Sequence, residues 1–119
     1  MNVLVVDDSN FIRLNIVNYL KNNNITVVGE ASNGNEAIEL YKKLRPDIVT
    51  MDITMPDMDG VEAVKKIMEI DSNAKIIICS AVGQQVKVIE AIKAGAKSFL
   101  LKPLNEEKMI IEINKVISF

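Results

Sequence analysis

Short runs of apolar, mostly β-branched residues alternate five times with longer stretches in which apolar positions recur every three or four residues. The short runs predict strands that are buried on both faces, and the longer stretches predict amphipathic helices. The expected strands are 2–6, 25–31, 48–51, 75–79 and 98–101, and the expected helices are 9–22, 34–44, 60–70, 84–94 and 106–119. This alternation indicates an α/β fold with parallel strands joined by crossover helices.

Turn and breaker residues support several of these boundaries. An asparagine cluster at 22–24 ends the first helix, and Asn33-Gly34 leads into the second. Gly95 suits the end of the fourth helix, because glycine adopts the left-handed conformation at no steric cost. No linker rich in Pro, Gly or Ser interrupts the pattern, so one domain over residues 1–119 with no output domain is expected.

Composition and charge exclude several classes of protein. A chain of 119 residues can bury one self-sufficient core, and 25% charged with 49% hydrophobic residues is ordinary for a folded domain. The net charge is −2 and only Arg13 and Arg45 are arginines, which disfavours nucleic-acid binding. No basic leader precedes the first strand and no apolar span is long enough to cross a bilayer, so a cytoplasmic location is expected.

The chain contains one cysteine and no histidine. Cys79 ends an apolar run and cannot form an internal disulfide, so we expect it to be a small buried apolar residue. The absence of histidine excludes histidine-based catalysis and histidine-ligated metals within this chain. Any phosphohistidine involved in its function must belong to a partner.

Polar side chains follow four of the apolar runs. Asp7 and Asp8 follow the first run, Asp52 the third, Ser80 the fourth and Lys102 the fifth. Parallel α/β sheets bind ligands beyond the carboxyl ends of their strands. The sequence therefore predicts that these five side chains meet at one edge of the sheet.

Three carboxylates at one edge require a cation. Unit like charges about 4 Å apart repel by about 4 kcal/mol at an effective dielectric constant near 20. Mg²⁺ is the natural candidate, because it binds one or two carboxylates and completes its shell with water and phosphate oxygens. Asp8 and Asp52 suit direct ligation, Asp7 suits a water-mediated role, and the backbone carbonyl of Thr54 could supply a further oxygen.

The same set suits covalent phosphoryl chemistry. A carboxylate such as Asp52 can attack phosphorus to form an aspartyl-phosphate. Lys102 would balance the charge on the phosphoryl oxygens, and Ser80 would donate one hydrogen bond to them. Each residue alone has an ordinary interpretation, such as Asp8-Ser9 capping a helix, but unrelated caps would not place these groups on successive strand ends.

Five segments of the chain closely resemble the receiver domain of two-component response regulators. They are residues 5–9 (VVDDS), 51–60 (MDITMPDMDG), 80–81 (SA), 94–96 (AGA) and 99–103 (FLLKP). The resemblance covers essentially the whole chain. It implies a flavodoxin-like (βα)5 doubly wound sandwich whose five-stranded parallel sheet has the order 2-1-3-4-5.

The resemblance also implies a role for each site residue. These roles are Asp52 as phosphoacceptor, Asp7 and Asp8 as metal-binding acids, Ser80 as switch hydroxyl, Phe99 as aromatic switch, and Lys102 as phosphate partner before a cis Lys102-Pro103 bond. Phe99 stands where enteric chemotaxis members carry tyrosine. Thr54 and Val82 stand where other members carry side chains that could orient a hydrolytic water, so the lifetime of the phosphoryl group is left open.

Because the likeness is greatest to stand-alone regulators of thermophilic-bacterial and archaeal style, it implies a chemotaxis regulator. A CheA-like histidine kinase would donate the phosphoryl group, and an archaeal CheF-type adaptor or a bacterial FliM-type switch protein would receive the signal. The chain would be a monomeric switch that catalyses only its own phosphorylation and dephosphorylation. Two alternatives stay open: a phosphorelay carrier that passes phosphoryl to a histidine phosphotransfer protein, and a phosphohydrolase that forms an aspartyl-phosphate.

Some apolar residues are not explained by the predicted core. In the last helix, Ile111 lies off the apolar stripe, and in the fourth helix Ile89 and Ile92 form the expected core stripe with Val88 off it. Val88, Phe99 and Ile111 are therefore predicted to form a partner surface. Substitution of Val88 or Ile111 with Asp should abolish partner binding and leave phosphorylation intact.

Overall fold

The computed structural model describes residues 1–118 and contains a five-stranded parallel sheet in the order β2-β1-β3-β4-β5. The strands are β1 (Asn2–Val6), β2 (Thr26–Ala31), β3 (Ile48–Asp52), β4 (Ile76–Ser80) and β5 (Ser98–Leu101). The helices are α1 (Asn10–Asn22), α2 (Gly34–Leu44), α3 (Gly60–Ile70), α4 (Gln85–Ala94) and α5 (Glu106–Ile117). The predicted flavodoxin-like fold and strand order are confirmed.

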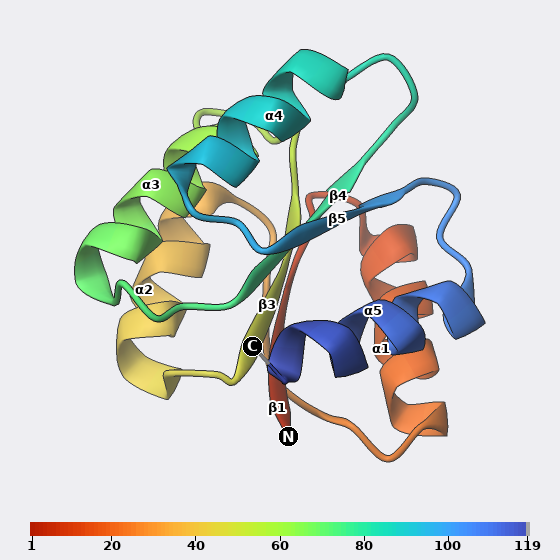
Figure 1. The fold of residues 1–119 in the computed structure, drawn as a ribbon. Helices are drawn as coiled ribbons and strands as arrows, with labels where there is room; N and C mark the ends of the chain where they lie inside the picture. Colours follow the sequence, from red (N-terminus) through yellow and green to blue (C-terminus); the bar gives the residue numbers. More distant parts are fainter. Residues whose placement is uncertain (119) are drawn as a thin grey trace.

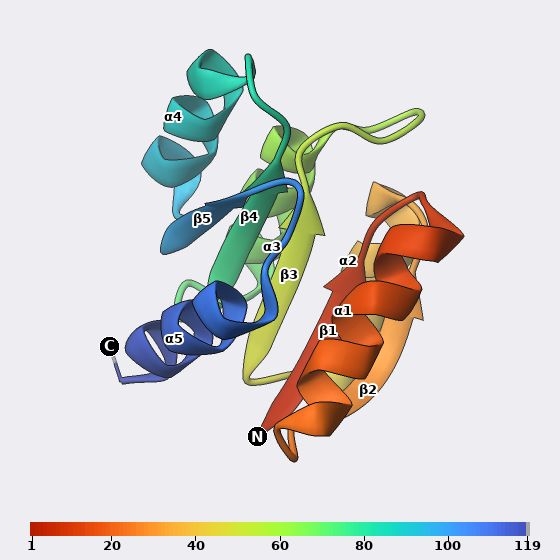
Figure 2. The ribbon, with the colours of Figure 1, turned by 90° about the vertical axis from the view of Figure 1, so that its right-hand side faces the viewer.

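The helices form a layer on each face of the sheet (Figure 1). Alternate residues of each strand point to opposite faces, so Val3 and Val5 pack with α1 and α5, whereas Leu4 and Val6 pack with α2, α3 and α4. Each face therefore has its own apolar core. Figure 2 shows β5 along one edge of the sheet, beside α4 and α5.

Two predicted site residues, Asp52 and Ser80, are themselves paired with neighbouring strands at the carboxyl ends of β3 and β4. Asp52 pairs with Cys79, and Ser80 pairs with Leu101. β3 and β4 thus end on Asp52 and Ser80 and not one residue before them, because parallel pairing continues through these positions. β2 begins at Thr26, one residue after the predicted start.

Four helices begin with a polar side chain that accepts a hydrogen bond from the backbone N–H three residues later. These caps are Ser9, Asn33, Asp59 and Asn105. At the start of α4, Gln84 makes no such bond. Within residues 1–118 no helix is both long and apolar enough to cross a membrane.

The buried face of α4 differs from the prediction. Val88 is 7% exposed and packs in the core with Ala91, whereas Ile89 is 54% exposed and Ile92 is 40% exposed. The assignment of Val88 to an exposed partner surface is therefore wrong. The helix turns its Val88 and Ala91 side inward because the small alanine allows α4 to approach the layer beneath it closely.

Candidate functional site

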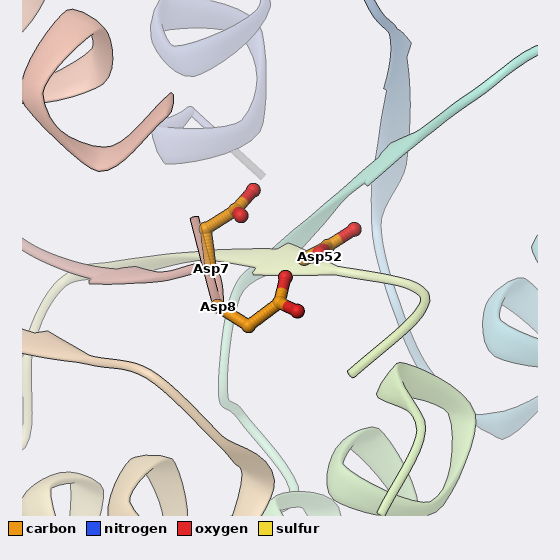
Figure 3. Close-up of side chains that lie close together, drawn as sticks. All are labelled: Asp7, Asp8 and Asp52. Atoms are coloured by element: carbon orange, nitrogen blue, oxygen red, sulfur yellow. The ribbon is translucent and has the colours of Figure 1, made fainter. Parts of the chain in front are cut away.

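The three predicted carboxylates meet at the ends of β1 and β3, as Figure 3 shows. Oxygen atoms of Asp7, Asp8 and Asp52 all lie within 4.8 Å of one another. Asp7 and Asp52 are buried, and Asp8 is exposed. One edge of the acidic cluster is thus open to solvent, where an ion or a phosphoryl donor can approach.

Lys102 joins the two buried carboxylates. Its Nζ lies 3.0 Å from Asp7 Oδ2 and 3.1 Å from Asp52 Oδ1, and the following Lys102-Pro103 bond is cis, as predicted. Burial acts to lower the pKa of Lys102, but its hydrogen bonds and attraction to Asp7 and Asp52 outweigh burial and raise that pKa. The lysine is therefore a fixed positive charge beside the expected phosphoacceptor.

The surroundings of Asp52 disfavour its charged form. Burial and the nearby charge of Asp7 raise the pKa of Asp52, Lys102 opposes this increase, and together they bring the pKa to about 6. Three carboxylates face one lysine, so the cluster keeps an excess of negative charge at pH 7. Hard oxygen donors with excess negative charge are the ligands that Mg²⁺ takes, so these residues fit that ion.

The backbone of α3 packs directly against the end of β3. The N–H of Gly60 donates to the carbonyl of Ile53 at 2.8 Å. A Cβ atom at Gly60 would lie 2.5 Å from the carbonyl oxygen of Asp52 and 2.8 Å from the Cα of Ile53. Only glycine at position 60 therefore permits this close contact between α3 and β3, which fixes the backbone of Asp52.

We predict that Gly60→Ala lowers the free energy of unfolding by about 2 kcal/mol, because main-chain atoms must move to admit the new methyl group. Gly34→Ala is the matched control at the first residue of α2. There the new Cβ meets the side chain of Met58, which can rotate away, so a loss below about 1 kcal/mol is expected. Equal losses in urea unfolding would contradict the proposed role of the Gly60 contact.

Thr54 lies at the mouth of the site. It is exposed, its N–H is 3.4 Å from Asp52 Oδ1, and its hydroxyl accepts a hydrogen bond from the Gln84 side chain. Its predicted role as a metal ligand through the backbone carbonyl stays a prediction.

Ser80 is fully buried beside the acidic cluster, at the end of β4. Within residues 1–118, its Oγ and the Oγ1 of Thr50 are buried side-chain oxygens without a hydrogen-bond partner. A buried hydroxyl without a partner costs free energy and is rare in folded proteins. Ser80 therefore has a free donor that a ligand at the site could use.

A groove of about 230 Å³ lies next to Ser80, between α4 and β5, and is lined almost entirely by apolar atoms. The buried Val88 lines this groove from α4, and Phe99 and Leu101 line it from β5. Phe99 is 47% exposed, so this aromatic side chain is only partly packed. The groove offers space beside the Ser80 hydroxyl.

The predicted partner surface is partly supported by exposure. Phe99 and Ile111 are exposed at 47% and 48%, whereas Val88 is buried. Ile89 and Leu101 are also exposed on α4 and β5 and were missed. The two-residue spacing of Phe99 and Leu101 on an edge strand was the signal that could have placed them on one face.

Sequence reasoning also missed two polar residues near the site. Arg13 Nη1 donates to the backbone carbonyl of Asp7 at 2.5 Å, which holds the end of β1. Gln84 bonds both Ala81 and Thr54 and so bridges two loops at the site. Neither residue belongs to a short motif, so no local pattern marked them.

Comparison with known proteins agrees with this geometry. Residues 3–114 match the family described as response regulator receiver domain. The chain is 57% identical to chemotaxis protein CheY of Thermotoga maritima over 114 residues (96% of this chain, 95% of that protein) and 52% identical to CheY of Bacillus subtilis over 116 residues (98% and 97%). A crystal structure of the CheX-CheY-BeF3-Mg²⁺ complex from Borrelia burgdorferi superposes with a TM-score of 0.93 at 39% identity, covering 98% of this chain and 88% of that chain.

Proposed function

The chain belongs to the response regulator receiver domain family, and from this membership we propose that it is a chemotaxis regulator switched by phosphorylation of Asp52. The observation that carries the proposal is the position of Lys102 Nζ, about 3 Å from both Asp7 and Asp52, beside the unpartnered hydroxyl of Ser80. A nucleophile, a cation and a free donor thus meet at one strand edge. No ordinary cap or surface ion pair requires that combination.

Phosphoryl transfer would proceed from a phosphohistidine on a CheA-like kinase. A carboxylate oxygen of Asp52 forms the new bond to phosphorus, and the nitrogen–phosphorus bond of the donor breaks. The imidazole nitrogen keeps the electron pair and is protonated from solvent. Lys102 would balance the negative charge on the phosphoryl oxygens, so catalysis would rest on positioning and electrostatics. On this proposal the protein catalyses only its own phosphorylation and dephosphorylation.

Asp8 and Asp52 are the residues that would hold Mg²⁺, with Asp7 behind them and the Thr54 carbonyl as a further donor. When bound, the ion neutralises carboxylate and phosphoryl charge. Lys102 keeps its hydrogen bonds to Asp7 and Asp52 and maintains the orientation of the nucleophile. Addition of Mg²⁺ is expected to raise the melting temperature, because a ligand of the folded state stabilises that state.

The switch would begin at Ser80. A phosphoryl group adds about −1.5 to −2 charge and strong acceptor oxygens, and the free Ser80 hydroxyl is placed to donate to them. Movement of the Ser80 loop would let Phe99 turn from its half-exposed position into the adjoining groove. The surface formed by α4, β5 and α5 would change shape with it.

The receiving partner would be a bacterial FliM-type switch protein or an archaeal CheF-type adaptor. Affinity capture from the host lysate with protein activated by Mg²⁺ and beryllofluoride, against an Asp52→Ala control, tests the output. Enrichment of a motility switch component by the activated protein alone supports the proposal. Enrichment of histidine phosphotransfer proteins in its place would favour a phosphorelay carrier, and identical captures would contradict coupling from Asp52 to the surface.

We predict that Ile111→Asp weakens binding of the captured partner at least tenfold, because it places a charge in an apolar contact. Beryllofluoride binding at Asp52 should be unchanged, since Ile111 lies on the exposed side of α5. Leu14→Asp on α1 is the matched control, because it also replaces an exposed aliphatic residue by a charge but lies outside this surface. Equal partner binding by wild type and Ile111→Asp, measured by calorimetry, would place the interface elsewhere.

A further inference from the structure

Gln84 spans the mouth of the site with its side chain. Its Oε1 accepts a hydrogen bond from the backbone N–H of Ala81 at 2.8 Å, and its Nε2 donates to the hydroxyl of Thr54. Ala81 follows the last residue of β4, and Thr54 lies two residues after the last residue of β3. One side chain thus ties together the two loops that flank Asp52.

The first turns of α4 make a second tie to the same loop. Lys87 lies one turn after Gln84, on the same side of the helix, and its Nζ is 2.6 Å from Asp59 Oδ2. Asp59 caps α3 at the end of the loop that begins after Asp52. α4 is therefore held to the β3–α3 loop by one amide bridge and one ion pair.

The amide bridge occupies a backbone donor directly after β4, the strand that pairs with the end of β3 where Asp52 lies. The N–H of Ala81 adjoins Ser80, at the end of the strand paired with β3. Ala81 is exposed, and its backbone N–H would still donate preferentially to an anionic oxygen, since charge-assisted hydrogen bonds are about twice as strong as neutral ones. The Gln84 carbonyl and a phosphoryl oxygen would compete for the same proton.

We propose that Gln84 is a latch that stabilises the resting arrangement of the two loops and must release Ala81 when Asp52 is phosphorylated. Gln84 does not touch the reacting atoms, so it is a positioning residue. This inference rests on the proposed function of Asp52 as phosphoacceptor. On this proposal, the hydrogen bonds of Gln84 at the start of α4 contribute part of the free-energy difference between the resting and activated states.

Gln84→Met tests the latch, because methionine has a similar length and favours helices but makes neither bond. The measurement is the affinity for beryllofluoride at saturating Mg²⁺, by titration calorimetry. We expect about tenfold tighter binding, equivalent to about 1.4 kcal/mol, because the anion no longer displaces the amide. Val86→Met is the control on the same turn of α4, since the Val86 side chain is 70% exposed, and it should bind like wild type.

Unchanged or weaker binding by Gln84→Met would overturn the latch while leaving the proposed function intact. If wild type itself bound no beryllofluoride, the proposed function would fail first, so the two failures are distinguishable. Hydrogen exchange gives a second readout, because a general loss of stability would speed exchange at many amides and not at Ala81 alone. The Ala81 amide should exchange faster in Gln84→Met, with the amides of β4 unchanged; protection equal to that of wild type would also overturn the proposal.

Discussion

Asp52→Asn is expected to abolish phosphorylation by small phosphodonors and yet to make the folded protein more stable at pH 7 by about 1 to 2 kcal/mol. The loss follows because an amide cannot attack phosphorus as a carboxylate does. The gain follows because Asp52 is buried close to Asp7, and burial and that like charge raise the pKa of Asp52 to about 6. Asparagine fills the same space without the charge.

The pH dependence of this gain has a definite sign. An unfolded aspartate has a pKa of about 3.9, so between about pH 4 and pH 6 the folded protein binds more protons than the unfolded chain. The wild type consequently loses stability as pH rises through this window and carries the full cost above it. The advantage of Asp52→Asn should be complete at pH 7 and absent near pH 4.

Urea unfolding at several pH values, without Mg²⁺, measures this effect. Asp57→Asn is the control, because Asp57 is exposed in the same loop and both residue types tolerate its positive φ of 68°. A stability change of less than about 0.5 kcal/mol is expected for the control. Destabilisation by Asp52→Asn at pH 7 would mean that the cluster stabilises the fold as a network of ion pairs.

The sequence predicted the fold because its local signals agree with one another. Strand β4 is continuously apolar over residues 76–79, and polar caps precede four helices. Polar residues of distinct chemistry stand at the ends of β3 and β4 and directly after β1 and β5. The convergence of Asp7, Asp52 and Lys102 followed from their positions at the ends of parallel strands, and the family resemblance supplied the strand order. The sequence alone could not give the separations of 3.0 and 3.1 Å between Lys102 Nζ and the carboxylates of Asp7 and Asp52, because these depend on side-chain conformation.

The errors arose where packing overrides hydrophobicity. By hydrophobic pattern alone, Ile89 and Ile92 of α4 outrank Ala91, but close approach between helices favours the side that carries the alanine. Gln84 was missed because its two partners, Ala81 and Thr54, come from different loops. A residue that acts by bridging distant segments leaves no spacing signature in one sequence.

Lys102→Met is expected to destabilise the folded protein, in contrast to Asp52→Asn, and to slow phosphorylation strongly. Removing the cation leaves Asp7 and Asp52 buried and mutually repulsive, which should lower the free energy of unfolding by about 3 kcal/mol at pH 7. Phosphorylation should slow by about 100-fold, since the charge that stabilises the phosphoryl oxygens is lost. Lys97→Met, on an exposed lysine before β5, should change neither quantity.

The cause of that instability can be isolated by three manipulations of the same variant. Lower pH should restore stability, because without Lys102 the raised pKa of Asp52 rises further and protonation removes the repulsion at a higher pH than in wild type. Mg²⁺ should restore part of it by replacing the missing positive charge. The double variant Lys102→Met with Asp52→Asn should be less destabilised than the sum of the single changes, since the neutral partner no longer needs the cation. The loss of about 3 kcal/mol could instead persist at pH 5, with Mg²⁺ and in the double variant. That result would show that Lys102 stabilises the fold by packing its aliphatic chain, and not by charge.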